Sequence, residues 1–122
     1  THEIENLILI NRLVNSPGLL AYQDETTGRI YPGTIDMNKF NSEHLEEVLS
    51  NENKRIAVNI ELINLETEES VRAYVNEERA RIWDDYLYIG GFAASNQARL
   101  VRIFNNGEFK KGLLKIKVLE KV

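Results

Sequence analysis

Residues 16–33, SPGLLAYQDETTGRIYPG, hold the only two prolines of this 122-residue chain, Pro17 and Pro32. Each proline is followed directly by a glycine. Proline cannot continue a helix, and glycine accepts the positive φ that a type II turn requires. Residues 19–31 between the two steps predict a β-hairpin with the five-residue loop DETTG. We therefore expect the chain to leave a first element at Pro17 and to close the hairpin at Pro32.

The segment before Pro17, residues 2–15, predicts a helix. Thr1 is a suitable N-cap residue, and the run from Asn15 to Gly18 is a stop signal. A buried strand over residues 6–10 is the alternative, because short Ile/Leu runs fit both structures.

The apolar residues of this helix lie around almost its whole circumference: Ile4, Leu7, Ile8, Leu9, Ile10, Leu13 and Val14. A helix with so wide an apolar surface needs cover on a second side. We expect it to pack on its own domain through Ile4, Leu7, Ile8 and Val14. Leu9 or Leu13 is then left more exposed, for contact with another subunit, a loop or an upstream anchor.

Two further hairpins and a short helix are predicted after the second proline. Residues 41–53 read as a helix capped by Asn41 or Ser42. The predicted strands cover residues 54–65, 71–75, 97–104 and 113–122. Asn106-Gly107 is the turn of the last hairpin, with a positive φ at Gly107. Residues 76–97 are open between a helix from Asn76 to about Tyr86 and an irregular segment.

These elements predict an α+β fold. Its N-terminal helix packs on a single antiparallel β-sheet, and a short second helix accompanies it. Residues 1–122 form one domain, with residues 1–16 as the N-terminal helix and residues 19–122 as the hairpin-rich sheet domain.

The charge of the chain is unevenly distributed. The net charge is −4, which argues against a dedicated nucleic-acid binder. Residues 41–78 hold ten carboxylates and three basic residues, whereas residues 99–122 hold seven basic residues and two carboxylates. Such a field orients a partner or a neighbouring copy, or the two segments lie against each other within one fold.

Catalytic and metal-binding patterns are lacking. The chain has no cysteine and two histidines, His2 and His44. His44 and Glu47 have the spacing of two metal ligands on one helix, but a solvated polar face explains them more simply. The DETTG loop lacks the acidic spacing of a calcium loop. We therefore predict no catalytic, cofactor-binding or metal-binding residues, and a protein that is not an enzyme.

The candidate interface residues are apolar or aromatic: Leu9, Leu13, Trp83, Tyr86, Tyr88 and Phe92. The first two lie on the N-terminal helix. The aromatic residues form the densest aromatic region of the sequence, which is suited to a contact surface or a small-ligand pocket as well as to a core.

Two stretches carry a family resemblance: RLVNSPGLLAYQDETTGRIYPGTIDMNKFN, residues 12–41, and VRIFNNGEFKKGLLKIKVLEKV, residues 101–122. They resemble small archaeal cell-surface proteins with one N-terminal hydrophobic helix, and the order of elements looks like the soluble part of a type IV pilin-like protein. In that family the first helix anchors the subunit in the membrane and forms the filament core. This chain departs from it by lacking the anchor, the processing-site region and the cysteines of many bacterial relatives.

The resemblance implies a non-enzymatic surface or filament-assembly domain, presented from a membrane-anchor helix upstream of Thr1. Its partners are then a protein or further copies bound through the N-terminal helix, and the membrane, but not nucleic acid. It also implies a location at the cell surface. The alternative is a cytoplasmic module that binds a protein or a small ligand.

Overall fold

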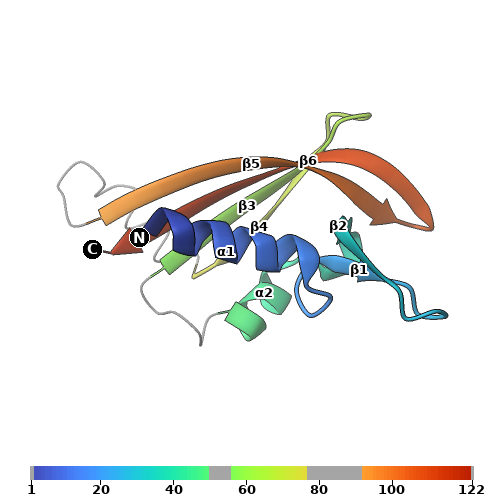
Figure 1. Ribbon diagram of the computed structural model, residues 1–122. Helices are drawn as coiled ribbons and strands as arrows, with labels where there is room; N and C mark the ends of the chain where they lie inside the picture. The colour runs from blue at the N-terminus through green and yellow to red at the C-terminus, as the bar shows by residue number, and fades with distance from the viewer. Residues whose placement is uncertain (1, 50–55, 77–91, 122) are drawn as a thin grey trace.

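The computed structural model in Figure 1 is a curled sheet with two helices on its concave side. It describes residues 2–49, 56–76 and 92–121. More than half of the described residues lie in strands, so the fold is mostly β. The elements in chain order are α1 (His2–Asn15), β1 (Ala21–Gln23), β2 (Ile30–Asp36), the 3-10 helix η1 (Met37–Lys39), α2 (Ser42–Leu49), β3 (Ile56–Asn64), β4 (Ser70–Val75), β5 (Phe92–Asn105) and β6 (Glu108–Lys121).

The sheet is mixed, with the strand order β1-β2-β5-β6-β3-β4. All neighbours are antiparallel except β2 and β5, which are parallel. The prediction of an N-terminal helix on a single antiparallel sheet is therefore wrong. The reason lies in the connection from β2 to β3. These two strands run in the same direction, and strands with a common direction need a long crossover, here supplied by η1 and α2. The β5–β6 hairpin fills the space between them.

The second Pro-Gly step bends β2 and does not close the hairpin. Ala21 is opposite Ile35, whereas the next residue, Tyr22, is opposite Tyr31. Three residues of β2 thus lie between consecutive partners on β1, Pro32, Gly33 and Thr34. Gly33 has a φ of 76°, which glycine adopts without steric cost. The hairpin itself is closed by the DETTG loop, so the predicted turn at Pro32 is wrong and its place is taken by a bulge.

The first Pro-Gly step does end α1, as predicted. The turn after it is held by side chains from further along the chain. Lys39 Nζ donates to the carbonyl oxygens of Pro17 at 2.6 Å and Ala21 at 2.8 Å, and His44 Nε2 lies 2.9 Å from the carbonyl oxygen of Leu19. These contacts join the end of α1 to η1 and α2.

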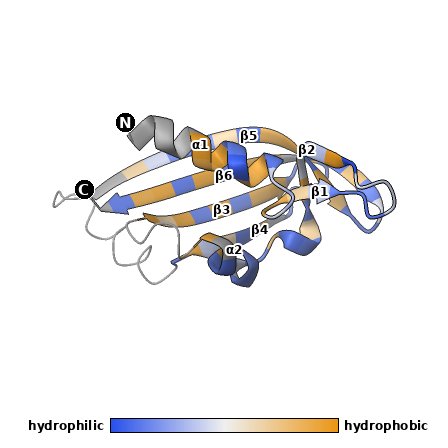
Figure 2. Cartoon of the chain, turned by 60° about the horizontal axis from the view of Figure 1, so that its bottom comes forward, coloured by the Kyte–Doolittle hydropathy of each residue, from blue (hydrophilic) through white to orange (hydrophobic). Residues whose placement is uncertain are grey.

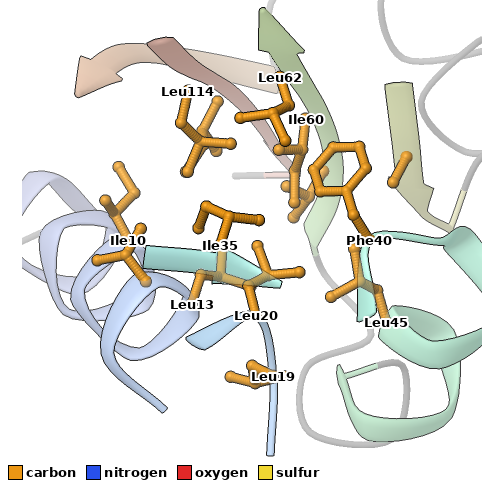
Figure 3. Packing of buried hydrophobic residues seen from close by; sticks show 14 of the residues in the cluster. Ile10, Leu13, Leu19, Leu20, Ile35, Phe40, Leu45, Ile60, Leu62 and Leu114 are labelled. Carbon is orange, nitrogen blue, oxygen red and sulfur yellow. The ribbon is translucent and has the colours of Figure 1, made fainter. Parts of the chain in front are cut away.

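The core lies between the sheet and the helices. Alternate residues of β3 and β6 face it, and Figure 2 shows this alternation as orange and blue bands along both strands. Figure 3 shows apolar side chains from the helices, from the segments next to them and from the sheet, which together form one cluster. Those labelled are Ile10, Leu13, Leu19, Leu20, Ile35, Phe40, Leu45, Ile60, Leu62 and Leu114.

The buried residues of α1 differ from those predicted. Ile10, Leu13 and Val14 are buried, with the i, i+3, i+4 spacing of one helix face. Val14 is buried as predicted, whereas Ile8 is 55% exposed, so its predicted core position is wrong. Of Leu9 and Leu13, one of which is predicted to be more exposed, Leu13 is 0% exposed and Leu9 is partly buried. The side chains of Ile4 and Leu7 lie outside the described part.

The last hairpin is longer than predicted. Asn106 and Gly107 have φ values of 53° and 77°, which confirms the turn. Only these two residues separate the paired Asn105 and Glu108, so both strands begin directly at the turn. Each strand has 14 residues. β5 consequently begins at Phe92, five residues before the predicted start at Gln97.

Candidate binding groove

Four aromatic rings gather where the β1–β2 hairpin meets the end of the β5–β6 hairpin. They belong to two directly opposed cross-strand pairs, Tyr22 with Tyr31 and Phe104 with Phe109. The Tyr22 and Phe104 ring centroids are 3.9 Å apart with the rings nearly parallel, and those of Phe104 and Phe109 are 5.0 Å apart. We call these four residues the aromatic cluster. It joins the two hairpins: Tyr22 stacks on both Tyr31 and Phe104, and Phe109 is tilted against Phe104.

A groove opens beside this cluster, where β2 leaves β5. The bulge bends β2 so that only Thr34, Ile35 and Asp36 pair with β5, at Arg102, Ile103 and Phe104. The preceding residues diverge and leave a groove of about 540 Å³. It is lined by Arg29, Ile30, Tyr31, Pro32, Gly33, Thr34, Leu100, Val101, Arg102 and Lys111. We call this set the basic groove.

Three cations line the basic groove, Arg29, Arg102 and Lys111, and no carboxylate is among its lining residues. Arg29 lies over the Tyr31 ring, with its guanidinium carbon 4.9 Å from the ring centroid, a favourable cation–π geometry. Within residues 2–49, 56–76 and 92–121, these three cations have no ion-pair partner. The groove therefore attracts anions, although the whole chain has a net charge of −4.

Apolar side chains complete the groove walls. Leu100 is 75% exposed and Ile30 is 39% exposed, and the aromatic cluster continues the wall through Tyr31. Phe109 of that cluster is 47% exposed. A ligand in the groove would thus contact both cations and apolar surface, a combination typical of sites that bind a polypeptide segment.

Two other hollows are less suited to a ligand. The hollow between the β3–β4 turn and the β5–β6 turn holds about 210 Å³, which is below the roughly 300 Å³ at which ligand pockets begin. At its rim Lys110 Nζ is 3.8 Å from Glu108 Oε2 and 4.0 Å from Glu66 Oε1. The hollow of about 400 Å³ on the outer sheet face contains the Arg72–Glu61 ion pair, at 3.2 Å.

Of the residues predicted as an interface, the structure describes the side chains of Leu9 and Leu13. Leu13 belongs to the core, and Leu9 is partly buried against it. Phe92 begins β5, but its side chain is outside the described part. The other three, Trp83, Tyr86 and Tyr88, also lie outside it. Among the α1 side chains that the structure describes, Ile8 is the large apolar one that is exposed.

The separation of charge along the sequence is partly explained by the fold. β3 from the acidic segment pairs with β6 from the basic segment, and Glu61 is directly opposite Lys115. The two segments thus lie against each other, as one of the two sequence interpretations predicts.

The candidate metal ligands have structural contacts instead. His44 is the side chain that contacts the Leu19 carbonyl oxygen. In the DETTG loop, Asp24 Oδ1 accepts hydrogen bonds from the backbone amides of Thr26 at 2.8 Å and Thr27 at 3.1 Å. The amides of Thr27 and Thr26 lower the pKa of the Asp24 carboxyl. Across the described residues, no group of three or more His, Cys, Asp or Glu side chains is placed to hold a metal ion.

No protein-family model, curated protein or solved structure matches this chain. The resemblance to type IV pilin-like and archaeal cell-surface proteins therefore stays a prediction, as do the cell-surface location and the upstream anchor. Within the described part of the chain, no helix is long and apolar enough to cross a membrane.

Proposed function

We propose that this domain is a non-enzymatic interaction module that binds an acidic, extended segment of a partner protein in the basic groove. The observation that carries the proposal is the set of three cations in the groove, Arg29, Arg102 and Lys111, without a lining carboxylate. In a protein of net negative charge, such a local surplus of positive charge costs stability by self-repulsion and favours an anionic ligand.

The shape of the groove favours an extended polypeptide over a compact ligand. It lies between two diverging strands, and its cations come from the β1–β2 loop, from β5 and from β6. Exposed Leu100 and Ile30 stand beside these cations. An extended segment points successive side chains in opposite directions, so carboxylates on one side can meet the cations while apolar residues contact the walls.

Single-stranded nucleic acid is the competing anionic ligand. Sequence-independent binding of single strands relies on free aromatic faces on which bases stack. Here Tyr22 stacks on Tyr31 and Phe104, and Arg29 lies over the Tyr31 ring. Phe109 is half exposed, but one such ring of the cluster does not form a series of stacking platforms. The arrangement of the rings therefore favours an acidic peptide.

Fluorescence anisotropy tests this function with a labelled peptide of about ten residues in which glutamate alternates with valine, long enough to span roughly 33 Å. We expect the double variant Arg102→Gln/Lys111→Gln to weaken binding by about tenfold or more, because charge-assisted hydrogen bonds are lost. Added salt should weaken binding of the native protein.

The matched control is Lys110→Gln, because Lys110 neighbours Lys111 but belongs to the other hollow, near Glu66 and Glu108. This variant should retain the native affinity. Equal losses in Lys110→Gln and in the groove variant would show a diffuse charge effect, and the proposed site would then be wrong. A lysine-valine peptide that binds as tightly as the acidic one would contradict the function.

A further inference from the structure

The two long edges of the sheet differ in their protection. The edge of β4 is covered by α2: Ser42 Oγ accepts a hydrogen bond from the Tyr74 amide at 2.9 Å, and the Glu46 carboxylate accepts one from the Asn76 amide. On the opposite side, β2 covers β5 only at residues 102–104. Among the strands that the structure describes, none pairs with residues 92–101 of β5 on that side.

The hydrogen-bond alternation of antiparallel strands identifies the groups at this open edge. Tyr74 and Asn76 direct their amides away from β3, so Ala73 and Val75 bond to β3. The same alternation continues through the registers of β3, β6 and β5. It follows that the odd-numbered residues of β5 make the backbone hydrogen bonds to β6.

The amides and carbonyls at the open edge therefore belong to the even residues of β5: Ala94, Asn96, Ala98 and Leu100. The same alternation places Arg102 toward β2, which agrees with its observed pairing there. The side chains of these even residues are all exposed, so side chains and backbone of the edge are accessible together from the outer face.

Part of this edge lacks proline and charged residues, two features by which sheets prevent pairing with another chain. Residues 94–98 are Ala-Ser-Asn-Gln-Ala, without proline, lysine or another charge. The next residue, Arg99, is directed to the inner side, where its Nη1 donates to Asn11 Oδ1 of α1 at 2.7 Å. Helix α1 thus provides support on the inner side of the edge.

We propose that the acidic segment binds as an additional β-strand along residues 94–100 of β5, in line with β2 and ending in the basic groove. This inference rests on the proposed function, and it adds the mode of binding: backbone hydrogen bonds to the edge give affinity. Carboxylates of the added strand that face the outer side contact Arg102 and Lys111.

The charges identify the occupant as an acidic partner and not a second copy of the edge. Two copies paired through β5 would bring β5 residues into both grooves, and β5 contains no carboxylate from Phe92 to Asn105. Arg29, Arg102 and Lys111 would then remain without counter-charges. An acidic segment satisfies the backbone edge and the three cations together.

The variant Ala98→Pro tests the mode of binding, because it removes an edge amide that the fold does not use and adds a ring that blocks an incoming strand. Proline is tolerated at such solvent-facing edge positions. We expect the glutamate-valine peptide to bind about tenfold more weakly. The matched control, Ala98→Ser, keeps the amide and should bind as the native protein does.

A second measurement leaves the protein unchanged, in case Ala98→Pro does not fold. Two versions of the peptide carry N-methyl groups on alternate amides, one version on the odd and the other on the even positions. Because only one set of amides faces β5 in an added strand, we expect one version to lose affinity and the other to keep it.

The outcomes separate the two proposals. If both N-methylated peptides bind like the parent while Arg102→Gln/Lys111→Gln still weakens binding, strand addition is wrong and the interaction module stands. If the native protein sedimented as a dimer that Ala98→Pro dissociates, the occupant would be a second copy and not an acidic partner. Single-stranded DNA that competes equally with the peptide would also overturn the choice of partner.

Discussion

Gly112 of β6 packs closely against the Ile103 side chain of β5. A Cβ atom at this position would lie 2.6 Å from Cδ1 and 2.8 Å from Cγ1 of Ile103, and 3.2 Å from the carbonyl oxygen of Ile63. The first two distances are shorter than real carbon contacts, and Ile103 is buried. We therefore expect Gly112→Ala to lower the free energy of unfolding by about 1–3 kcal/mol, measured by urea denaturation.

A double-mutant cycle shows whether this clash is the cause. Ile103→Val removes the Cδ1 atom and should cost about 0.5–1.5 kcal/mol alone. In combination with Gly112→Ala, we expect the total loss to be smaller than the sum of the two single losses. Additive losses would mean that the cost of Gly112→Ala arises elsewhere.

We expect Tyr22 to make the stability of the protein sensitive to alkaline pH. Burial of its ring in the aromatic cluster raises the pKa of the phenol above its ordinary value of 10.0, and the Asp24 carboxylate adds to this shift. A pKa that is higher in the folded state favours the protonated form there. The contribution is complete below the unfolded pKa and is lost as the pH rises through the folded pKa.

We expect the native protein to lose more stability than Tyr22→Phe between about pH 9 and pH 11, since phenylalanine keeps the packing and has no proton to lose. Urea denaturation at the two pH values measures the difference. The same alkaline loss in both proteins would place its origin in other groups.

At the scale of elements, the loops of the first two hairpins have the same hydrogen-bond pattern and backbone conformation. Asp24 Oδ1 accepts from the second and third amides after it, and Asn64 Oδ1 does the same with the amides of Glu66 and Thr67. In each loop the residue four positions later has a left-handed backbone, Gly28 with φ 73° and Glu68 with φ 65°. Glycine adopts this conformation readily and glutamate does not.

Replacing Glu68 with glycine should therefore stabilise the protein by about 0.5–1 kcal/mol. This net value is the gain from removing the left-handed strain minus the cost of the larger conformational entropy that glycine gives the unfolded chain. Thermal unfolding measures the effect. Glu68→Ala is the control, because it removes the same charge and keeps the Cβ atom. A gain in Glu68→Ala as large as that in Glu68→Gly would assign the effect to charge.

Local turn and strand patterns predicted most of these elements from the sequence. The end of α1 at Pro17, the DETTG loop and the Asn106-Gly107 turn all depend on neighbouring residues, and they are present. The Pro32-Gly33 step predicts a turn and forms a bulge instead, because both structures use the same two residues. The parallel pairing of β2 and β5 depends on the crossover through α2, which joins strands that are far apart in sequence.

The sequence does not predict the start of β5, for a related reason. Residues 92–96, Phe-Ala-Ala-Ser-Asn, have no apolar alternation. They are strand residues because they extend a ladder that the turn at Gly107 fixes in register with β6. The extent of a strand with one open edge and small side chains depends more on pairing with its partner strand than on its own sequence pattern.

At the scale of the whole molecule, folding collects the binding surface from separate segments. The basic groove combines residues 29–34, 100–102 and 111, and the aromatic cluster combines residues of four strands. No short sequence motif contains either set of residues. The net charge of −4 also gives no indication of a local group of three cations. The sequence offers one usable signal: Phe104 and Phe109 each lie two residues from the Asn106-Gly107 turn.

The most direct test of the binding surface is an NMR titration of the native protein with the glutamate-valine peptide. We expect the earliest and largest amide shifts at Ala94, Asn96, Ala98 and Leu100 on the edge of β5, and at Thr34 and Arg102 in the basic groove. The chemical shifts of the β4 amides should not change, because α2 covers the edge of that strand. Shifts confined to the hollow around Asn64 and Glu108, or no shifts at peptide excess, would contradict the account.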